Sequence, residues 1–309
     1  MKTGLILEGG GMRGLFSAGV IDVFMENGIE FDAAIGVSAG AAFGCNYKSR
    51  QIGRVIRYNK RFAKDPRFCS FRSLIKTGDL FGAEFCYHTI PDKLDIFDTP
   101  AYVENPMEFH VVCTDAETGK ALYFCDAETG DDTLEYFRAS ASMPLVSKPV
   151  EIKGRKLLDG GIADSVPVQY FESIGYNRNV IVLTQPQTFR KKPSSSVKLM
   201  RIVLRKYPNI IKAMEERHIE YNDTLDYIAE IIIGQAGTAV EYQMSGGCLV
   251  NFRDPVDGQN GSLLVMTMSG AHSDGQGVHA GFFAETLGFV HLGVIGAHAI
   301  LGKANMAQF

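Results

Sequence analysis

Residues 31–47, FDAAIGVSAGAAFGCNY, contain an apolar run that ends at a G-x-S-x-G motif, Gly36-Val37-Ser38-Ala39-Gly40. The run is typical of a short buried strand, and the small residues that follow are typical of a closely packed helix. A serine on a sharp turn from strand to helix has an exposed hydroxyl, and the flanking glycines let the two backbones approach each other. The stretch therefore predicts a nucleophile elbow with Ser38 at its tip.

The N-terminus shows the same order of strand, glycine loop and helix. Leu5-Ile6-Leu7 is followed by Gly9-Gly10-Gly11-Met12-Arg13-Gly14, and apolar residues then recur at helical spacing from 14 to 27. Gly9, Gly11 and Gly14 fit the G-x-G-x-x-G pattern, which can hold a dinucleotide at a helix N-terminus. It can also point consecutive backbone N–H groups at one spot as an oxyanion hole. A tight turn without a ligand is the third interpretation.

Acidic residues disfavour the dinucleotide interpretation. Glu8 stands directly before the first glycine, where a carboxylate would repel a pyrophosphate. The acids that could bind a ribose, Glu30 and Asp32, precede the second predicted strand, whereas that role needs an acid at the strand's end.

A third glycine motif, Leu157-Leu158-Asp159-Gly160-Gly161, follows a predicted strand. An Asp-Gly pair alone is typical of a turn. A serine nucleophile needs a base, however, and a buried carboxylate within hydrogen-bonding reach can serve directly. Histidine is the alternative base, but His88, His110 and His218 have no catalytic signature around them and are interpreted as structural. A Ser–His–Asp triad would need a downstream histidine, such as His272 or His279.

The pattern of the remaining chain predicts an α/β fold. Strands are expected at 107–114 and 120–125, which a turn at 117–119 joins, and further strands at 150–158 and 179–183. Helices are expected at 133–142 and 165–174. Alternating strands and helices, with continuously apolar strands, favour a sheet covered by helices on both faces.

Composition excludes several classes of protein. The 309 residues are 46% hydrophobic with a formal net charge of −4, which is typical of a globular chain and not of a disordered one. The 35 acidic residues outnumber the 31 basic ones, which disfavours a nucleic-acid binder. No apolar run reaches 18 residues, and the N-terminus does not resemble a signal peptide. The six cysteines lack metal-ligand spacing and suggest reduced thiols, so a cytoplasmic location is expected.

The chain changes character after residue 233. Residues 234–309 contain only two Lys or Arg and five Asp or Glu, but 14 of the 33 glycines. We therefore predict a catalytic domain over 1–233 and an atypical, glycine-rich tail over 234–309, either a separate module or a frame-altered tail. From about residue 240 the tail is expected to be irregular or poorly packed, since it has no amphipathic period.

Together, the three glycine motifs resemble the patatin-like phospholipase family. Three connecting segments resemble its bacterial members: Arg138-Ala-Ser-Ala-Ser-Met-Pro144, Lys148-Pro149, and Asp159-Gly-Gly-Ile-Ala-Asp-Ser-Val-Pro167. The resemblance covers about residues 3–230. It implies a patatin-type fold with a mostly parallel central sheet and a Ser38–Asp159 dyad without a catalytic histidine. It also implies an oxyanion hole from the amides around Gly10, Gly11 and Met12, with Arg13 at the usual basic position, and no metal or cofactor.

The expected function is hydrolysis of lipid esters, of phospholipase A or lysophospholipase type. A Ser–His–Asp esterase and a non-enzymatic lipid- or nucleotide-binding module remain as alternatives. Residues 190–217 carry nine Lys or Arg, with apolar residues near helical spacing. Such a segment can lie on an anionic membrane surface, or it can pack on the core with a solvated basic face. The oligomeric state is not predicted.

Overall fold

The computed structural model describes residues 2–126, 132–186 and 188–234, and beyond them five short strands. The strands are β1 (Lys2–Leu7), β2 (Ala33–Val37), β3 (Glu108–Asp115), β4 (Ala121–Cys125), β5 (Val150–Ile152), β6 (Arg155–Asp159), β7 (Tyr176–Val182), β8 (Val240–Gln243), β9 (Leu249–Phe252), β10 (Ser262–Met266), β11 (His279–Ala280) and β12 (Ala297–His298). The longer helices are α1 (Leu15–Glu26), α2 (Ala39–Lys48), α3 (Arg54–Phe62), η2 (Phe85–Leu94), α7 (Thr133–Ser140) and α10 (Pro208–Gly234). The short helices are η1 (Gly11–Gly14), α4 (Phe71–Thr77), α5 (Thr99–Glu104), η4 (Gly160–Ile162), α8 (Val168–Ser173) and α9 (Val197–Val203).

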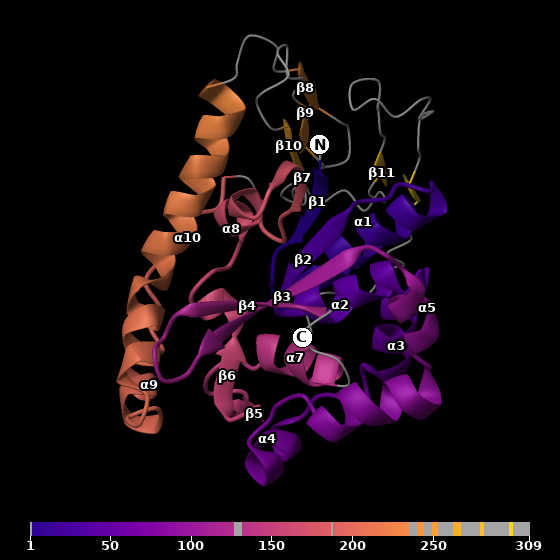
Figure 1. Cartoon of the computed structure of the whole chain (residues 1–309). Coiled ribbons are helices and arrows are strands. Elements are labelled where there is room, and N and C mark those ends of the chain that lie inside the picture. The colour runs from indigo at the N-terminus through magenta and orange to yellow at the C-terminus, as the bar shows by residue number, and fades with distance from the viewer. Residues whose placement is uncertain are drawn as a thin grey trace.

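A mixed sheet with a parallel centre organises the fold (Figure 1). In the described part of the chain the strands follow the order β5-β6-β3-β2-β1-β7-β10-β9-β8, and β4 pairs with β3 outside this path. Neighbouring strands from β3 through β2, β1 and β7 to β10 are parallel. β4, β5, β6, β8 and β9 pair antiparallel with their neighbours. The mostly parallel α/β sheet expected from the sequence is confirmed.

Helices cover both faces of this sheet, because successive side chains of each strand point to opposite faces and so contribute to two separate hydrophobic cores. Leu5 and Leu7 of β1 belong to the core under α1, α2 and α7, which also holds Phe24 and Phe137. Ile6, between them, belongs to the core under α8 and α10. Figure 1 shows α10 along one side of the sheet and α1, α2 and α3 on the other.

Two expectations for local structure are corrected. The predicted strand over 150–158 is a hairpin of β5 and β6. Lys153 and Gly154, which join the strands, both have positive φ (49° and 77°), as a tight two-residue hairpin turn requires. The basic segment 190–217 is not one helix but the end of a loop, α9 and the start of α10. Pro208 opens α10, where its missing N–H costs no hydrogen bond.

Part of the predicted tail continues the sheet. β10 pairs parallel with β7, and β9 and β8 follow it antiparallel, a regular pairing that the fading periodicity after 233 does not predict. The boundary at residue 233 stays a prediction, and most of the tail, including His272, lies outside the described residues. Among the residues that the structure describes, no helix is both long and apolar enough to cross a membrane.

Candidate active site

Strand β3 brings Ser38 and Asp159 together. One edge of β3 pairs with β4 through Thr114, and the other pairs with β2 as far as Val112. β6 pairs with β3 from Cys113 onward. Because β4 already occupies the first edge at Cys113 and Thr114, β6 pairs on the second edge, directly beyond the end of β2. Ser38 follows the last residue of β2, and Asp159 is the last residue of β6. The ends of two strands that run toward each other therefore meet beside the same point of β3.

The backbone at Ser38 has the strained geometry of a nucleophile elbow. Its φ and ψ are 55° and −119°, a region that residues with a side chain rarely occupy. Its amide N–H donates to Ser140 Oγ at 2.8 Å, and that hydroxyl donates to Val112 O at 2.6 Å. Ser140 on α7 is fully buried, so it supports the turn from beneath. The sharp turn expected between strand and helix is present, the role of Ser38 as nucleophile stays a prediction, and Ser140 is a supporting residue that the sequence motif does not contain.

The carboxylate of Asp159 accepts one hydrogen bond at each oxygen. Ser38 Oγ donates to Oδ2 at 2.7 Å, and the amide of Gly161 donates to Oδ1 at 2.8 Å. Burial raises the pKa of Asp159. The bond from Ser38, the charge of Arg217 and the bond from Gly161 each oppose this rise by favouring the charged form. The carboxyl group is thus oriented toward the serine hydroxyl and able to accept its proton.

The glycine loop borders the same site but contributes unevenly to it. Gly11 and Met12 line a cavity together with Ser38. Gly10 instead packs against Thr184, where a Cβ would lie 2.4 Å from Oγ1. The amide of Arg13 donates to Gly10 O at 3.2 Å and is therefore already engaged. Of the four residues expected around an oxyanion, Gly11 and Met12 are the two that share the cavity with Ser38.

Glu8 has a structural environment in the loop. Its buried carboxylate accepts hydrogen bonds from Thr184 N at 2.6 Å and from Tyr221 Oη at 2.8 Å. These bonds join the end of β1 to the residues after β7 and to α10. Burial raises the pKa of Glu8, and the bonds from Thr184 and Tyr221 work against that rise. Thr184 and Tyr221 lie 176 and 213 residues from Glu8 in the chain, so no local sequence pattern indicates these partners.

An apolar cavity of about 160 Å³ opens beside Ser38. Small residues of α2, Ala39 and Ala42, border it near the serine. Much of its wall is aromatic and comes from α2, α3, η2, α7 and the segments between them: Phe43, Tyr58, Phe68, Phe81, Tyr87 and Phe137. A wall of this kind fits a hydrocarbon chain far better than a charged or strongly hydrated group.

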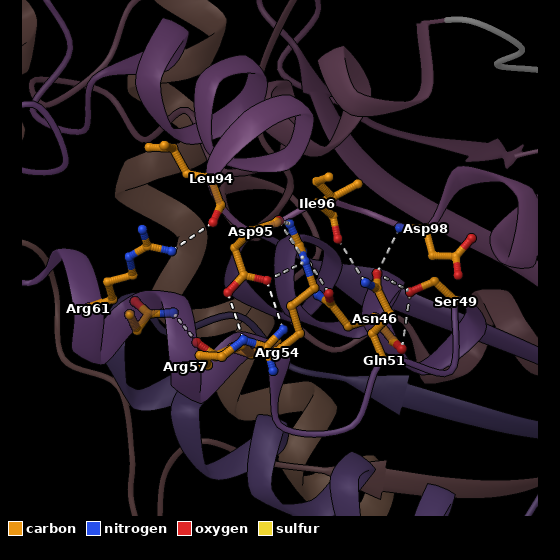
Figure 2. A network of polar contacts seen from close by, with 12 residues as sticks. Asn46, Ser49, Gln51, Arg54, Arg57, Arg61, Leu94, Asp95, Ile96 and Asp98 are labelled. Atoms are coloured by element: carbon orange, nitrogen blue, oxygen red, sulfur yellow. Dashed lines mark hydrogen bonds and ion pairs between the residues drawn. The ribbon is translucent and has the colours of Figure 1, made fainter.

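A network of polar contacts joins α2, α3 and the end of η2 (Figure 2), and its Arg54 also lines the cavity. Arg54 on α3 donates to Asn46 Oδ1 at 2.8 Å and to Asp95 O at 3.1 Å. Arg57 binds the Asp95 carboxylate through two bonds of 2.8 Å each. Asp95 directly follows η2, a π-helix that lines the cavity, so these bonds tie η2 to α2 and α3. Arg54 and Asp95 are both buried, and hydrogen-bonded charges of this kind favour a single arrangement of the elements that they join.

A comparison with family models identifies the chain. The model described as patatin-like phospholipase matches residues 5–172, more than half of the chain, and this range includes the glycine loop, Ser38 and Asp159. The chain belongs to the patatin-like phospholipase family. The resemblance noted in the sequence is confirmed.

Curated relatives of this patatin-like protein are distant. It is 29% identical over 211 residues to the uncharacterized protein YjjU of Escherichia coli, and this match covers 62% of this chain and 54% of YjjU. It is 29% identical over 182 residues to lysophospholipase nte1 of Aspergillus niger, which covers 56% of this chain but 11% of nte1. The chain thus spans about half the length of the first relative and a tenth of the second. Among solved structures, VipD from Legionella pneumophila matches with a TM-score of 0.37 and 14% identity, over 79% of this chain and 57% of VipD.

Three histidines of this patatin-like protein, His88, His110 and His218, have side chains within the described part of the chain. His110 is buried on β3, with Nε2 3.3 Å from Glu108 Oε2, and His88 Nε2 on η2 lies 3.2 Å from Glu135 Oε1. His218 lies within α10, one residue after Arg217. The side chains of His272 and His279 lie outside the described residues. The described hydrogen bond of the Ser38 hydroxyl goes to a carboxylate.

One group of metal-ligand type occurs away from the serine. Atoms of Glu108, His110 and Cys125 that can ligate a metal lie within 4.8 Å of one another. Glu108 and His110 pair with Ala33 and Ile35 of β2, so they lie toward the opposite end of that strand from Ser38. The Glu108 carboxylate also accepts a bond from Tyr176 Oη at 2.9 Å. This group belongs to the sheet's other end and takes no part in the arrangement around Ser38.

Helix α10 supplies a residue that the motifs do not reveal. Arg217 Nε donates a short hydrogen bond to the carbonyl oxygen of Gly161, which lies two residues after Asp159 in the chain. Its charge favours the ionised form of Asp159, as does that of Lys191 in the loop before α9. Both residues come after the range of the family match. Basic side chains in a helix ordinarily indicate a solvated face, so no sequence pattern distinguishes Arg217 from its neighbours.

Proposed function

We propose that this protein is a serine hydrolase of lipid esters, of phospholipase A or lysophospholipase type, that works through a Ser38–Asp159 dyad. The observation that carries the proposal is the 2.7 Å hydrogen bond from Ser38 Oγ to Asp159 Oδ2 at the edge of an apolar cavity. Membership of the patatin-like phospholipase family supports the substrate class. The name lysophospholipase carried by one relative is consistent with it.

The chemistry follows from this arrangement. Asp159 takes the proton of Ser38 as Oγ attacks the ester carbonyl carbon, which produces a tetrahedral oxyanion. The backbone amides of Gly11 and Met12 stabilise this charge, helped by the positive end of the helix that starts at Gly11. Asp159 then gives the proton to the leaving alcohol. Water attacks the acyl-enzyme with Asp159 again as the base, and the fatty acid leaves.

The cavity favours an acyl chain as the group bound beside Ser38. Its aromatic wall can bury methylene groups, each worth about 0.8 kcal/mol of transfer free energy. The polar part of the substrate would then remain toward the glycine loop and solvent. A panel of phospholipids, lysophospholipids and short esters, assayed with purified protein and with Ser38→Ala, tests the proposal. Hydrolysis of none of these esters, or equal hydrolysis by Ser38→Ala, would reject it.

Substitution of histidines separates the dyad from a Ser–His–Asp esterase. We expect His110→Gln, His218→Gln, His272→Gln and His279→Gln each to retain labelling of Ser38 by a fluorophosphonate probe, because the base in the dyad is Asp159. Labelling rates are read by mass spectrometry of the Ser38 peptide, with Ser38→Ala as the blank. Loss of labelling in a variant that keeps its circular-dichroism spectrum would favour a triad, and a wild type that reacts with no serine probe would favour a non-enzymatic binding module.

The pH dependence of catalysis should respond to Arg217. Asp159 must be ionised to accept a proton, so activity falls as the pH falls through its pKa. Arg217 favours the ionised form, and therefore Arg217→Gln should raise the pKa of Asp159 and move the acidic limb of kcat/KM to higher pH. Arg217→Lys keeps the charge and should move the limb less.

Other ionisable groups near Asp159 are unchanged in these variants. The charge of Lys191 also lowers the pKa of Asp159. The charge of Asp159 in turn contributes to the raised pKa values of Tyr87 and Cys113. A variant of Arg217 whose kcat/KM fell by the same factor at every pH would show a purely structural role for this arginine.

A further inference from the structure

Two short helices expose apolar side chains to solvent. Eleven large hydrophobic residues are exposed in the described part of the chain, and five of them lie on the seven-residue helices α4 and α9. On α4 these are Phe71 and Ile75, which are spaced i and i+4 and so share one face. Ile75 is 86% exposed and Phe71 78%, so nearly all of this apolar face is open to solvent.

Helix α9 has two apolar faces. Met200 and Leu204 are buried in a core cluster with Met214 of α10, and this face accounts for much of the apolar spacing seen in the sequence. Leu199, Ile202 and Val203 project from the other side and are all exposed, Ile202 by 73%. One apolar face would suffice to attach α9 to the protein. The second face has no packing role in the described structure.

Both helices flank one segment beside the cavity. Leu145 packs against the core cluster that holds α9, whereas Val146 O accepts a bond of 2.7 Å from Leu80 N, just after α4. The amide of Lys148 donates to Asp79 Oδ1 at 2.9 Å. Ser147, between these two contacts, lines the cavity, as do Asp79 and Phe81. Figure 1 shows α4 and α9 at the same end of the molecule. The segment 145–148, which lines the cavity through Ser147, thus connects the neighbourhood of α4 to that of α9.

The charge of these segments has one sign. Residues 66–78 and 188–207 contain no Asp or Glu. The exposed bases of these two segments are Arg67, Arg72, Lys76, Arg190, Lys192, Lys198, Arg201, Arg205 and Lys206, and Lys148 is exposed on the segment between the two helices. Three of them form ion pairs with acids outside the segments, Arg67 with Asp65, Arg190 with Asp226 and Arg201 with Glu215, and the others have no such pair among the described contacts. Exposed apolar side chains on segments that carry bases and no acids match the boundary between acyl chains and anionic headgroups.

We infer that α4 and α9 form a docking surface for an anionic lipid bilayer, which places the mouth of the Ser38 cavity at the headgroup layer. This inference rests on the proposed function, and it means that the protein takes its lipid substrate from a bilayer surface. The apolar side chains Phe71, Ile75, Leu199, Ile202 and Val203 enter the outer part of the bilayer. The surrounding lysines and arginines bind the headgroups.

Vesicle sedimentation tests the docking surface without catalysis. Ser38→Ala protein, which leaves the lipid intact, is mixed with vesicles of phosphatidylcholine alone or with about a third phosphatidylglycerol. We expect Ile75→Ser/Ile202→Ser to lower binding to the anionic vesicles by at least about tenfold, through lost apolar burial. Lys198→Glu/Lys206→Glu should lower it by a similar factor and remove the preference for phosphatidylglycerol.

Val103→Ser is the matched control, because Val103 is 72% exposed but lies on α5, outside both α4 and α9, and is not part of the cavity wall. Asn105, next to α5, binds Lys48 O at the end of α2, and that helix begins about 15 Å away at Ser38. This variant should bind vesicles like the parent. With Ser38 restored, all variants should hydrolyse a short soluble ester at the parent rate, which shows that they are folded.

The outcomes separate this inference from the proposed function. Equal vesicle binding by all variants, or no preference for anionic lipid, overturns the docking surface even if esters are hydrolysed. Loss of self-association in Ile75→Ser/Ile202→Ser, measured by sedimentation velocity, would assign the surface to a second copy and also overturn it. Vesicle binding that depends on both helices supports docking, and the short-ester assay of the parent then decides the hydrolase proposal separately.

Discussion

Ser38→Ala and Asp159→Asn are each expected to reduce the kcat of ester hydrolysis by about a thousandfold or more, the scale seen when a member of a cooperating catalytic unit is removed. Without Oγ no acyl-enzyme forms. Asparagine can still occupy the space of Asp159 and accept the bond from Gly161, but it cannot take a proton from Ser38. The double variant should be no slower than either single variant, because the two residues act as one unit.

Stability measurements provide the control for this loss. Burial raises the pKa of Asp159 in the folded protein, so the folded state binds a proton more tightly than the unfolded chain. The free energy of unfolding therefore falls as the pH rises from the ordinary aspartate pKa through the raised one. Asp159→Asn removes this loss, and at neutral pH its melting temperature should equal or exceed that of the parent. More than about a tenth of the parent kcat in either folded single variant would contradict the dyad.

Gly40→Ala is expected to have the largest effect on stability. A Cβ at this position would lie 2.2 Å from Leu7 O and 2.8 Å from Leu7 C, which are backbone atoms of the central strand β1. They cannot rotate away as a side chain would, so β1 and α2 must separate, or the elbow must change shape. We expect the free energy of unfolding to fall by at least about 3 kcal/mol, the upper range for an overpacked core. Denaturant titration of the purified variants measures this change.

Gly19→Ala is the matched control for that substitution. Gly19 lies within helix α1, and a Cβ there would meet no atom within 4 Å. Alanine should stabilise the protein by up to about 1 kcal/mol, because it costs less backbone entropy than glycine in a helix. A Gly40→Ala protein whose unfolding free energy stayed within about 1 kcal/mol of the parent would show that the contact between β1 and α2 is loose, and the elbow with it.

The local features of this protein follow from its sequence. Apolar runs, glycine positions and helical spacing predict β1, β2, α1 and α2 with their turns, because each depends on residues close together in the chain. The elbow at Ser38 belongs to this class, since a strand, a tight turn and a small-residue helix specify it within 15 residues or so. The single strand predicted over 150–158 was wrong, because the turn at Lys153-Gly154 of the β5–β6 hairpin lies inside an otherwise strand-like run.

The site as a whole depends on contacts between distant segments. Asp159 lies 121 residues from Ser38 in the chain, and the family resemblance, not a local pattern, implies that the two form a dyad. The register of β6 and β2 on β3 brings their side chains within hydrogen-bonding distance. Arg217 and Tyr221 reach Gly161 and Glu8 only because α10 packs across the sheet.

The basic segment shows the same division between sequence and tertiary structure. Its apolar spacing marks a helix, but the sequence alone could not tell that Met200 and Leu204 would be buried while Ile202 stays exposed. Periodicity reports that a helix has an apolar side, and it carries no information about which neighbour covers that side. The sequence thus determined many strands and turns of this protein and the position of the serine between β2 and α2. Tertiary packing decided which carboxylate lies beside that serine, which helix packs next to it, and which apolar side chains remain exposed.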